Sequence, residues 1–255
     1  MINPFKTISN SLILRKPEQS SSTRALQSFA YPRNERIRPG EVHQVAIGWD
    51  NSPSTLVNSA QTEIASGSER LTSQVCDMPS LRRKIEFAIF GFGENTPTKC
   101  YCDFTLADAF KMPPLPTSYG TWIYELYIEM IDACINQMAK SSRDYDQDVR
   151  SAWLFFFSDF LLGDPSKHKQ ALEKKHEATE KAVNIFIMGA GDMVDEKVAC
   201  ELAQASRPPV WLKDVEDFTK FFDWLLRSLT RKGASMPGQQ LRLENFGGSS
   251  LIAEG

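Results

Sequence analysis

The feature that most constrains the fold is a set of short apolar runs separated by segments of helical periodicity. Four runs are almost continuously apolar: 42–49 (VHQVAIGW), 85–92 (IEFAIFGF), 153–157 (WLFFF) and 182–188 (AVNIFIM). Such runs are typical of strands that are buried on both faces, as strands of parallel sheets are. Two further segments, 99–105 and 210–212, are predicted as strands, with 99–105 at an edge of the sheet.

Three segments between or after these runs are predicted to be helices. Apolar residues in 121–139 and in 218–229 recur every three or four positions, which is the period of one helix face. The segment 165–181 is mostly charged and is predicted to be an exposed helix with solvated histidines. Strands that alternate with helices predict an α/β chain, a Rossmann-like doubly wound three-layer sandwich with a mostly parallel sheet.

Composition divides the chain of 255 residues into three parts. Residues 1–41 are rich in Ser, Pro and Arg and carry seven Lys or Arg against three Glu, so we predict a basic extension. Residues 42–232 are predicted to form the folded domain, and 233–255 a flexible tail with little apolar periodicity.

Charge and apolar patterning exclude several function classes. A net charge of −3 and a pI near 5.7 provide no global positive field, so no nucleic-acid partner is expected. No run approaches the roughly 18 apolar residues of a membrane span, so no membrane partner is expected. The five cysteines are odd in number and lack CxxC pairs, which predicts reduced thiols in a cytoplasmic protein.

Oxygen-bearing side chains follow two predicted strands and precede one predicted helix. Asp50, Ser52 and Ser54 come directly after the first strand, and Asp159 follows the strand at 153–157. Thr121 opens the long helix. Because ligands of doubly wound folds bind beyond the carboxyl ends of the strands, we expect these five side chains to converge there.

These five groups are hard oxygen donors without imidazole or thiolate, which favours Mg²⁺, Mn²⁺ or Ca²⁺ over Zn²⁺ or Cu. Each group also has a local explanation, since Asp followed by Ser is a common turn and Thr is a common helix cap. The joint occurrence of all five at the ends of predicted elements favours the metal site.

This set and the order of elements over about 42–230 resemble the von Willebrand factor A (VWA) domain and its metal-ion-dependent adhesion site (MIDAS). The resemblance implies an antiparallel edge strand in the sheet. It also implies that Ser52 and Ser54 are direct ligands, that Thr121 is a state-dependent ligand, and that Asp50 and Asp159 neutralise charge largely through water. A carboxylate of a partner protein would complete the metal's coordination.

Within that family the chain is most similar to bacterial TerY-like proteins, which are associated with tellurium resistance and stress. The segments that carry this similarity are 184–192 (NIFIMGAGD), 206–210 (SRPPV) and 218–229 (FTKFFDWLLRSL). The similarity implies work alongside other cytoplasmic stress-response or defence proteins.

Four residues depart from the family pattern. Phe160 replaces a common glycine, so its ring is expected to crowd or shield the metal. Ser158 stands where threonine is common, and Tyr119 stands where a second glycine is frequent. Pro53 lies inside the D-x-S-x-S loop and removes one amide donor.

The leading function predicted from these residues is a metal-dependent protein-interaction module without enzymatic activity. The alternatives are a Mg²⁺-dependent phosphate-ester hydrolase and a scaffold that binds without metal. Trp122, Tyr124 and Tyr127 are predicted either to form an aromatic rim beside the metal or to pack in the core. The oligomeric state does not follow from the sequence.

Overall fold

The structure is a computed structural model that describes residues 42–57, 60–94, 96–114, 116–145, 149, 151–161, 163–234, 240–242 and 252–254. All of them belong to one compact unit, Ile37–Gly255. The predicted basic extension, 1–41, lies outside the described residues.

The described residues contain a six-stranded sheet with the order β3-β2-β1-β4-β5-β6. Five strands run parallel, and β3 pairs with β2 in the antiparallel direction. The strand bounds are β1 His43–Trp49, β2 Ile85–Gly91, β3 Lys99–Leu106, β4 Ala152–Ser158, β5 Val183–Ala190 and β6 Val210–Leu212. The predicted α/β fold with an antiparallel edge strand is therefore confirmed.

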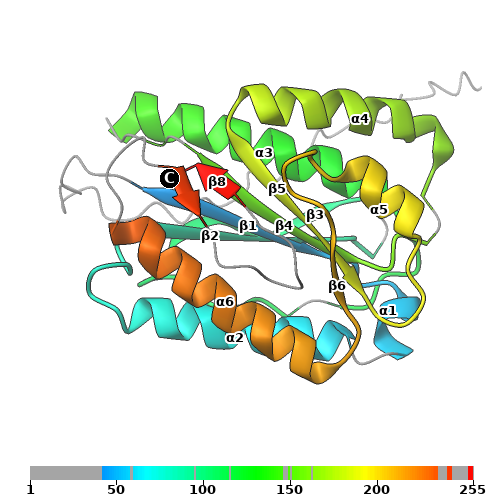
Figure 1. The fold of residues 1–255 in the computed structure, drawn as a ribbon, viewed down its shortest axis with the longest axis horizontal. Helices are drawn as coiled ribbons and strands as arrows, with labels where there is room; N and C mark the ends of the chain where they lie inside the picture. Colours follow the sequence, from blue (N-terminus) through cyan, green and yellow to red (C-terminus); the bar gives the residue numbers. More distant parts are fainter. Residues whose placement is uncertain are drawn as a thin grey trace, which may run out of the picture. The chain divides into compact units, whose positions relative to one another are not determined.

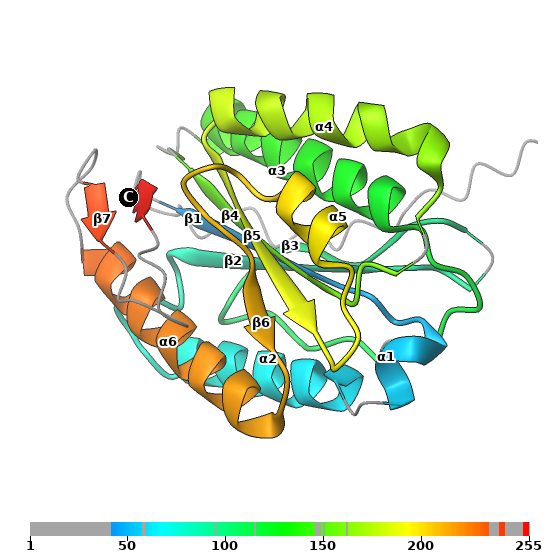
Figure 2. The ribbon, with the colours of Figure 1, turned by 45° about the vertical axis from the view of Figure 1, so that its right-hand side comes forward.

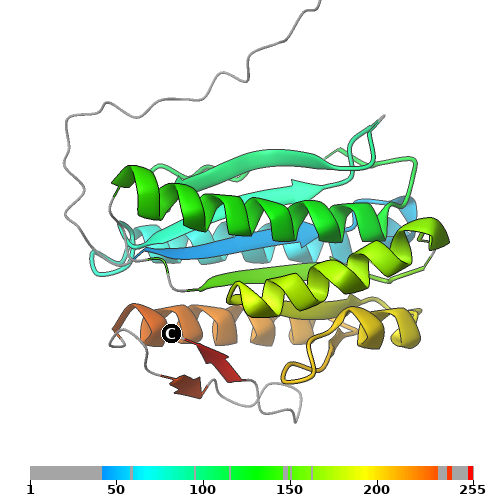
Figure 3. The same cartoon turned by 90° about the horizontal axis from the view of Figure 1, so that it is seen from above.

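Helices cover both faces of this sheet and make three layers. In Figures 1 and 2, α2 and α6 lie below the sheet, and α3, α4 and α5 lie above it. Figure 3 shows α3 and α4 side by side over the strands. The helix bounds are α1 Pro53–Val57, α2 Ala60–Cys76, α3 Ile123–Tyr145, α4 Pro165–Glu180, α5 Glu196–Leu202 and α6 Val215–Ala234. None of the helices described here is both long and apolar enough to cross a bilayer.

The helix α2 was not predicted from the sequence, and its packing explains why. Its buried face combines Ile64, Leu71 and Val75 with Gly67, Ser68 and Thr72, so small and polar residues interrupt the apolar stripe. A Cβ at Gly67 would stand 2.1 Å from the ring of Phe222 on α6. The close approach of α2 and α6 therefore depends on a residue that periodicity does not count as apolar.

The segment 233–255, predicted as a flexible tail, contains an antiparallel pair of short strands. β7, Gln240–Arg242, pairs with β8, Ile252–Glu254, so that Leu241 stands opposite Ala253. Two facing segments of three residues carry too little periodicity to be recognised in the sequence. The structure also extends α6 to Ala234, two residues past the predicted domain boundary.

Candidate metal site

The order of the strands places the candidate site between β1 and β4. β2 pairs with one edge of β1 and β4 pairs with the other edge. The strand order therefore reverses between β1 and β4. Trp49 stands opposite Phe157 in the parallel register, and the Asp50 amide donates to the Phe157 carbonyl over 2.8 Å. Asp50 therefore leaves the sheet beside Ser158 and Asp159.

The loop after β1 is closed by its own side chains. The Asp50 Oδ1 atom accepts from the Ser52 amide over 2.9 Å, and the Ser52 and Ser54 Oγ atoms are 3.0 Å apart. The Thr55 hydroxyl lies 2.8 Å from the carbonyls of both Asp50 and Ser52. Pro53 is the first residue of α1, where a missing amide hydrogen costs no helical hydrogen bond. The departure at Pro53 is thus compatible with the loop.

Ser158 fixes the other oxygen of the Asp50 carboxylate. Its hydroxyl donates to Asp50 Oδ2 over 2.8 Å, and its Oγ atom accepts from the Phe160 amide over 2.8 Å. Serine therefore supplies the hydroxyl at a position where the family commonly has threonine.

Asp159 is 3% exposed and lies in a tight turn after β4. Its Oδ1 atom accepts from the Leu161 amide over 3.0 Å. Phe160 has a φ of 57°, in the left-handed region that favours glycine. Its ring nevertheless points into the core, 5.5 Å from the ring of Phe156 and 1% exposed. The Phe160 ring therefore packs in the core, and the expectation that it crowds or shields the metal stays a prediction.

Thr121 lies half-buried just before α3, on a segment that is anchored to Asn51. The Asn51 side-chain amide donates to the carbonyls of Phe92 and Pro116 over 2.9 and 2.6 Å, and the Asn51 carbonyl accepts from Ser118 over 2.8 Å. Among the described residues, no hydrogen bond joins Thr121 to the other four candidates. Hydrogen bonds connect Asp50, Ser52 and Ser54 directly, whereas Thr121 is tied to them only through the bonds between Asn51 and its segment.

Burial sets the electrostatics of the site. It raises the pKa of Asp50 to about 6, and the charge of Asp159 adds to the rise while hydrogen bonds from Ser52 and Ser158 oppose it. Asp50 is fully buried, and neither aspartate forms an ion pair within the part of the chain that the structure describes. Two neighbouring buried carboxylates with no Lys or Arg beside them favour a cation.

The aromatic residues near Thr121 pack in the core rather than form a rim. Tyr127 is fully buried and donates to the Leu202 carbonyl over 2.8 Å, and Tyr124 is 6% exposed. The half-buried Trp122 packs edge-on against Phe92, with ring centroids 6.0 Å apart. Tyr119, which sequence reasoning noted only as a departure, is the exposed aromatic of this segment at 90%.

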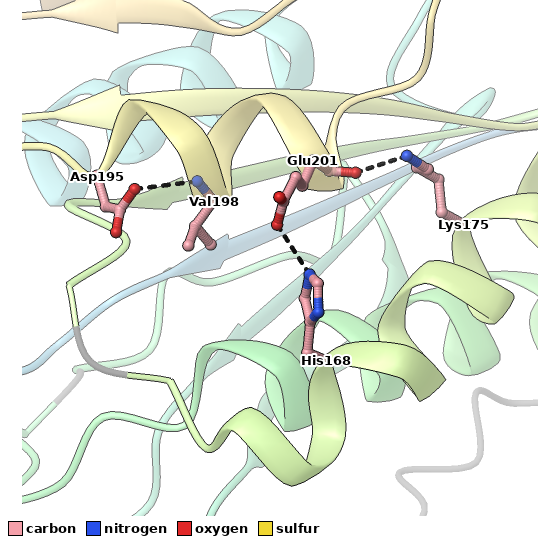
Figure 4. Close-up of polar contacts among 5 residues, drawn as sticks. All are labelled: His168, Lys175, Asp195, Val198 and Glu201. Carbon is pink, nitrogen blue, oxygen red and sulfur yellow. Dashed lines mark hydrogen bonds and ion pairs between the residues drawn. The ribbon is translucent and has the colours of Figure 1, made fainter.

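The residue that precedes α5, Asp195, holds the segment that carries Asp159. The Asp195 amide donates to the Asp159 carbonyl over 2.8 Å, and the Asp195 carboxylate caps α5 by accepting from Val198 over 3.0 Å. Figure 4 shows that α5 is in turn tied to α4 through Glu201. His168 Nε2 lies 2.9 Å from the Glu201 carboxylate, so this histidine is not simply solvated as predicted.

Sequence reasoning missed three residues that hold the site in place: Asn51, Thr55 and Ser118. All three bond to backbone carbonyls, and Asn51 links segments 41 and 65 residues away. Thr55 could have been found, because a hydroxyl three residues after Ser52 is a local motif. The partners of Asn51 and Ser118 depend on how distant loops meet.

No protein-family model and no curated protein matches the sequence. Solved structures do match the fold. The pilus adhesin SpaC of Lactobacillus rhamnosus GG matches 75% of this chain and 30% of its own length, at 8% identity and a TM-score of 0.58. Proximal thread matrix protein 1 of the mussel byssus matches 76% of this chain and 49% of its own, at 10% identity and a TM-score of 0.54. The chain thus spans half or less of these two proteins.

A third structure is a single domain of similar size. The vWF domain of the type V pili tip protein Mfa5 from Porphyromonas gingivalis matches over 75% of this chain and 96% of its own, at 10% identity and a TM-score of 0.54. The chain has the fold of a VWA domain. A further structure of the mussel protein, with a TM-score of 0.52 and 11% identity over 75% of this chain and 48% of its own, has a zinc-occupied MIDAS motif.

Proposed function

We propose that this VWA-fold chain is a metal-dependent protein-interaction module without enzymatic activity. Asp50, Ser52, Ser54, Thr121 and Asp159 would hold a divalent cation, Mg²⁺ or else Mn²⁺ or Ca²⁺, and the partner would offer an Asp or Glu side chain. The observation that carries the proposal is the cluster of two buried carboxylates and two adjacent hydroxyls at the carboxyl ends of β1 and β4.

The residues present fit a hard divalent cation. Every candidate donor is an oxygen, which suits Mg²⁺, Mn²⁺ and Ca²⁺. The Ser52 and Ser54 hydroxyl oxygens are already paired at 3.0 Å. Ser54 is exposed whereas Asp50 is fully buried, so the donor set spans the boundary between core and solvent. A partner can therefore approach from the Ser54 side.

When bound, the cation would supply positive charge that attracts a carboxylate. The residues of the chain have separate tasks. Asp50 and Asp159 provide negative charge that attracts the ion, while the neutral hydroxyls of Ser52 and Ser54 leave part of the ion's charge uncompensated. Ser158 and the Ser52 amide hold the Asp50 carboxylate in one orientation. Thr121, which is free of these hydrogen bonds, would respond to occupancy.

The setting of this interaction is proposed from sequence resemblance alone. The TerY-like segments, including 184–192, support a place in a bacterial stress-response or defence assembly in the cytoplasm. The 0 to 3% exposure of the two aspartates supports a binding role over hydrolysis, because a phosphate ester would need direct access to Asp50 or Asp159 as nucleophile or base.

The experiment uses Mn²⁺ as both ligand and probe. The chain is loaded with Mn²⁺, and the relaxation of water protons is followed while the capped peptide acetyl-Gly-Asp-Gly-amide is added. A matched Asn peptide is the control. We expect the Asp peptide alone to displace metal-bound water saturably, and only from wild type rather than Ser52→Ala/Ser54→Ala. Equal effects of the two peptides would contradict a carboxylate partner.

Two other results would identify the alternatives. Turnover of p-nitrophenyl phosphate with Mg²⁺ that disappears in Asp50→Asn would establish the hydrolase. Capture of a protein partner that persists in EDTA and in Asp159→Ala would establish a scaffold that binds without metal.

A further inference from the structure

A packed junction beside the candidate metal site joins the two segments that carry Thr121 and Asp159. Tyr124 lies in the first turn of α3, shortly after Thr121, and is 6% exposed. Gly163 lies in the turn between β4 and α4, shortly after Asp159. The ring of Tyr124 stands directly against Gly163, because a Cβ at Gly163 would be 2.5 Å from the ring atom Cε2. The two segments therefore meet at one contact.

This contact leaves no room for a side chain at Gly163. Carbon atoms in ordinary contact are about 3.5–4.0 Å apart, so an alanine methyl there would force one of the two segments to move by about 1 Å. The backbone of Gly163 does not have the positive φ that favours glycine. The closeness of the Tyr124 ring, rather than the backbone conformation, therefore requires glycine at this position.

The ring of Tyr124 is also enclosed by residues of α4 and α5. His168 of α4 packs against it, with ring centroids 5.3 Å apart. Figure 4 shows that His168 is itself held by Glu201 of α5, whose carboxylate lies 2.9 Å from the His168 Nε2 atom. Burial raises the pKa of Tyr124, and the charges of Glu201 and Asp195 add to the rise. The ring therefore has little space into which it can turn away from the contact.

The two segments differ in how firmly they are held. The segment that carries Asp159 continues from β4, and the Asp159 carbonyl accepts from the Asp195 amide over 2.8 Å. The Asp159 carboxylate also accepts from the Leu161 amide over 3.0 Å. In the part of the chain that the structure describes, no hydrogen bond joins Thr121 to the other candidate ligands. A change at the ring contact is therefore expected to displace Thr121 rather than Asp159.

We propose that Tyr124 is a positioning residue of the metal site, and that the packing of its ring on Gly163 sets the distance between Thr121 and Asp159. The proposal rests on the proposed function, because this distance matters to an ion only if both residues hold it. Metal–ligand distances vary by only about 0.2 Å, so a shift of about 1 Å is large for a ligand. Mg²⁺ requires near-octahedral geometry, whereas Ca²⁺ accepts flexible coordination. Tyr124 therefore favours Mg²⁺ over Ca²⁺.

The experiment compares calorimetric titrations of wild type and Gly163→Ala with Mg²⁺ and with Ca²⁺. Gly163→Ala should lower the Mg²⁺ affinity by up to about tenfold and the Ca²⁺ affinity by less than about twofold. In a Thr121→Ala background, Gly163→Ala should cause no further loss of Mg²⁺ affinity, because the ligand that it displaces is already absent.

Variants separate positioning from folding. Tyr124→Phe keeps the ring and should retain the ratio of Mg²⁺ to Ca²⁺ affinity, whereas Tyr124→Leu should lower that ratio. Gly163→Ala/Tyr124→Leu should regain part of the ratio lost in Gly163→Ala, because the shorter side chain makes room for the methyl. Gly67→Ala is the matched control, since its Cβ would be 2.1 Å from the Phe222 ring in the packing of α2 on α6. It should lower the melting temperature without changing the ratio.

Crystal structures of metal-free wild type and Gly163→Ala test the positioning step without an ion. We expect Thr121 to move by roughly 1 Å relative to Asp159. An unmoved Thr121, equal losses of affinity for both ions, or a further loss in the Thr121→Ala background would overturn the proposal. If wild type binds neither ion, the proposed function fails, and the displacement of Thr121 still decides whether Tyr124 positions it.

Discussion

The two ends of the central sheet bury charge in opposite ways. At the amino end, Lys232 is 1% exposed, and its ammonium donates to the Ser151 hydroxyl over 2.8 Å and lies 4.6 Å from the centre of the Trp153 ring. At the carboxyl end, Asp50 and Asp159 are buried near each other without an ion-pair partner in the described residues. The first charge has partners within the chain, whereas under the proposed function the two carboxylates are compensated by a cation from outside.

Under the proposed function, the carboxyl end of the sheet serves binding, whereas the amino end does not. A buried charge that the chain solvates itself needs no partner from outside, and its hydrogen bonds offset the cost of removing it from water. A buried carboxylate pair without a cation lowers the free energy of unfolding. An ion that binds the folded state raises that free energy by mass action.

The largest effect should be a change in the slope of stability against pH when His43 is replaced. Burial, helped by Lys232 and Lys84, lowers the pKa of His43 to about 3. The unfolded state therefore binds more protons than the folded state between about pH 3 and 6.5, and stability falls on acidification by up to roughly 5 kcal/mol.

Asp50 has the opposite sign, because its raised pKa lets the folded state bind more protons between about pH 4 and 6. Burial also raises the pKa of Glu86, which adds to the Asp50 effect. In EDTA, urea unfolding from pH 4 to 6 should give stability that falls more steeply with rising pH in His43→Leu than in wild type, because the variant lacks the opposing contribution of His43. The same slope in both proteins would contradict the assignment.

Lys232→Ala should lower the free energy of unfolding by roughly 3 kcal/mol, because it empties space beside Trp153 and removes the buried hydrogen bond from Lys232 to Ser151. Affinity for Mn²⁺ should not change, since this end of the sheet has no part in the metal site. Denaturant unfolding and calorimetry measure the two quantities. A loss of metal affinity as large as the loss of stability would mean that the two ends are not separate.

Asp50→Asn should raise the stability of the metal-free chain at pH 7 by roughly 2 kcal/mol. It removes a buried charge whose pKa is raised to about 6 and keeps an oxygen for the Ser52 amide. The same variant should show no stabilisation by metal. Ser166→Ala, at an exposed position in α4, is a control that should alter neither quantity strongly. If Asp50→Asn is less stable than wild type in EDTA, the carboxylate is structural rather than a binding group.

The smallest effect is expected at Thr121. Because no hydrogen bond in the described structure links it to the other candidates, Thr121→Ala should reduce Mn²⁺ affinity by at most about tenfold, or roughly 1.4 kcal/mol. Ser52→Ala should reduce it more, since Ser52 is bound to both Asp50 and Ser54. Calorimetric titrations measure the Mn²⁺ affinity of both variants. A larger loss of affinity in Thr121→Ala than in Ser52→Ala would contradict the importance given to the hydrogen bonds of Ser52.

The parts of the fold and site that could be predicted are those for which the sequence pattern allows few alternative structures. The strands were predictable because continuous apolar runs such as 153–157 have few alternatives to a buried strand. Asp50 and Asp159 were predicted to meet because the carboxyl ends of parallel strands share one edge. Their local order, including Ser158 as donor to Asp50, needed the register of β1 on β4.

Other features depend on close packing, which the spacing of apolar residues in the sequence does not reveal. Gly67 lets Phe222 approach α2, and Phe160 turns into the core through a left-handed backbone. The contact of Tyr124 with Gly163 forms only when α3 and the turn after β4 come together. All three features require the fold rather than the local sequence.

The most direct test of the central claim is a calorimetric titration with Mg²⁺ and Mn²⁺, accompanied by thermal unfolding, on wild type and Ser52→Ala/Ser54→Ala. The claim is that the carboxyl end of the sheet is a cation site completed from outside. It predicts saturable binding with a matching rise in melting temperature for wild type and neither for the double variant. No binding to wild type, or equal binding to both proteins, would contradict it.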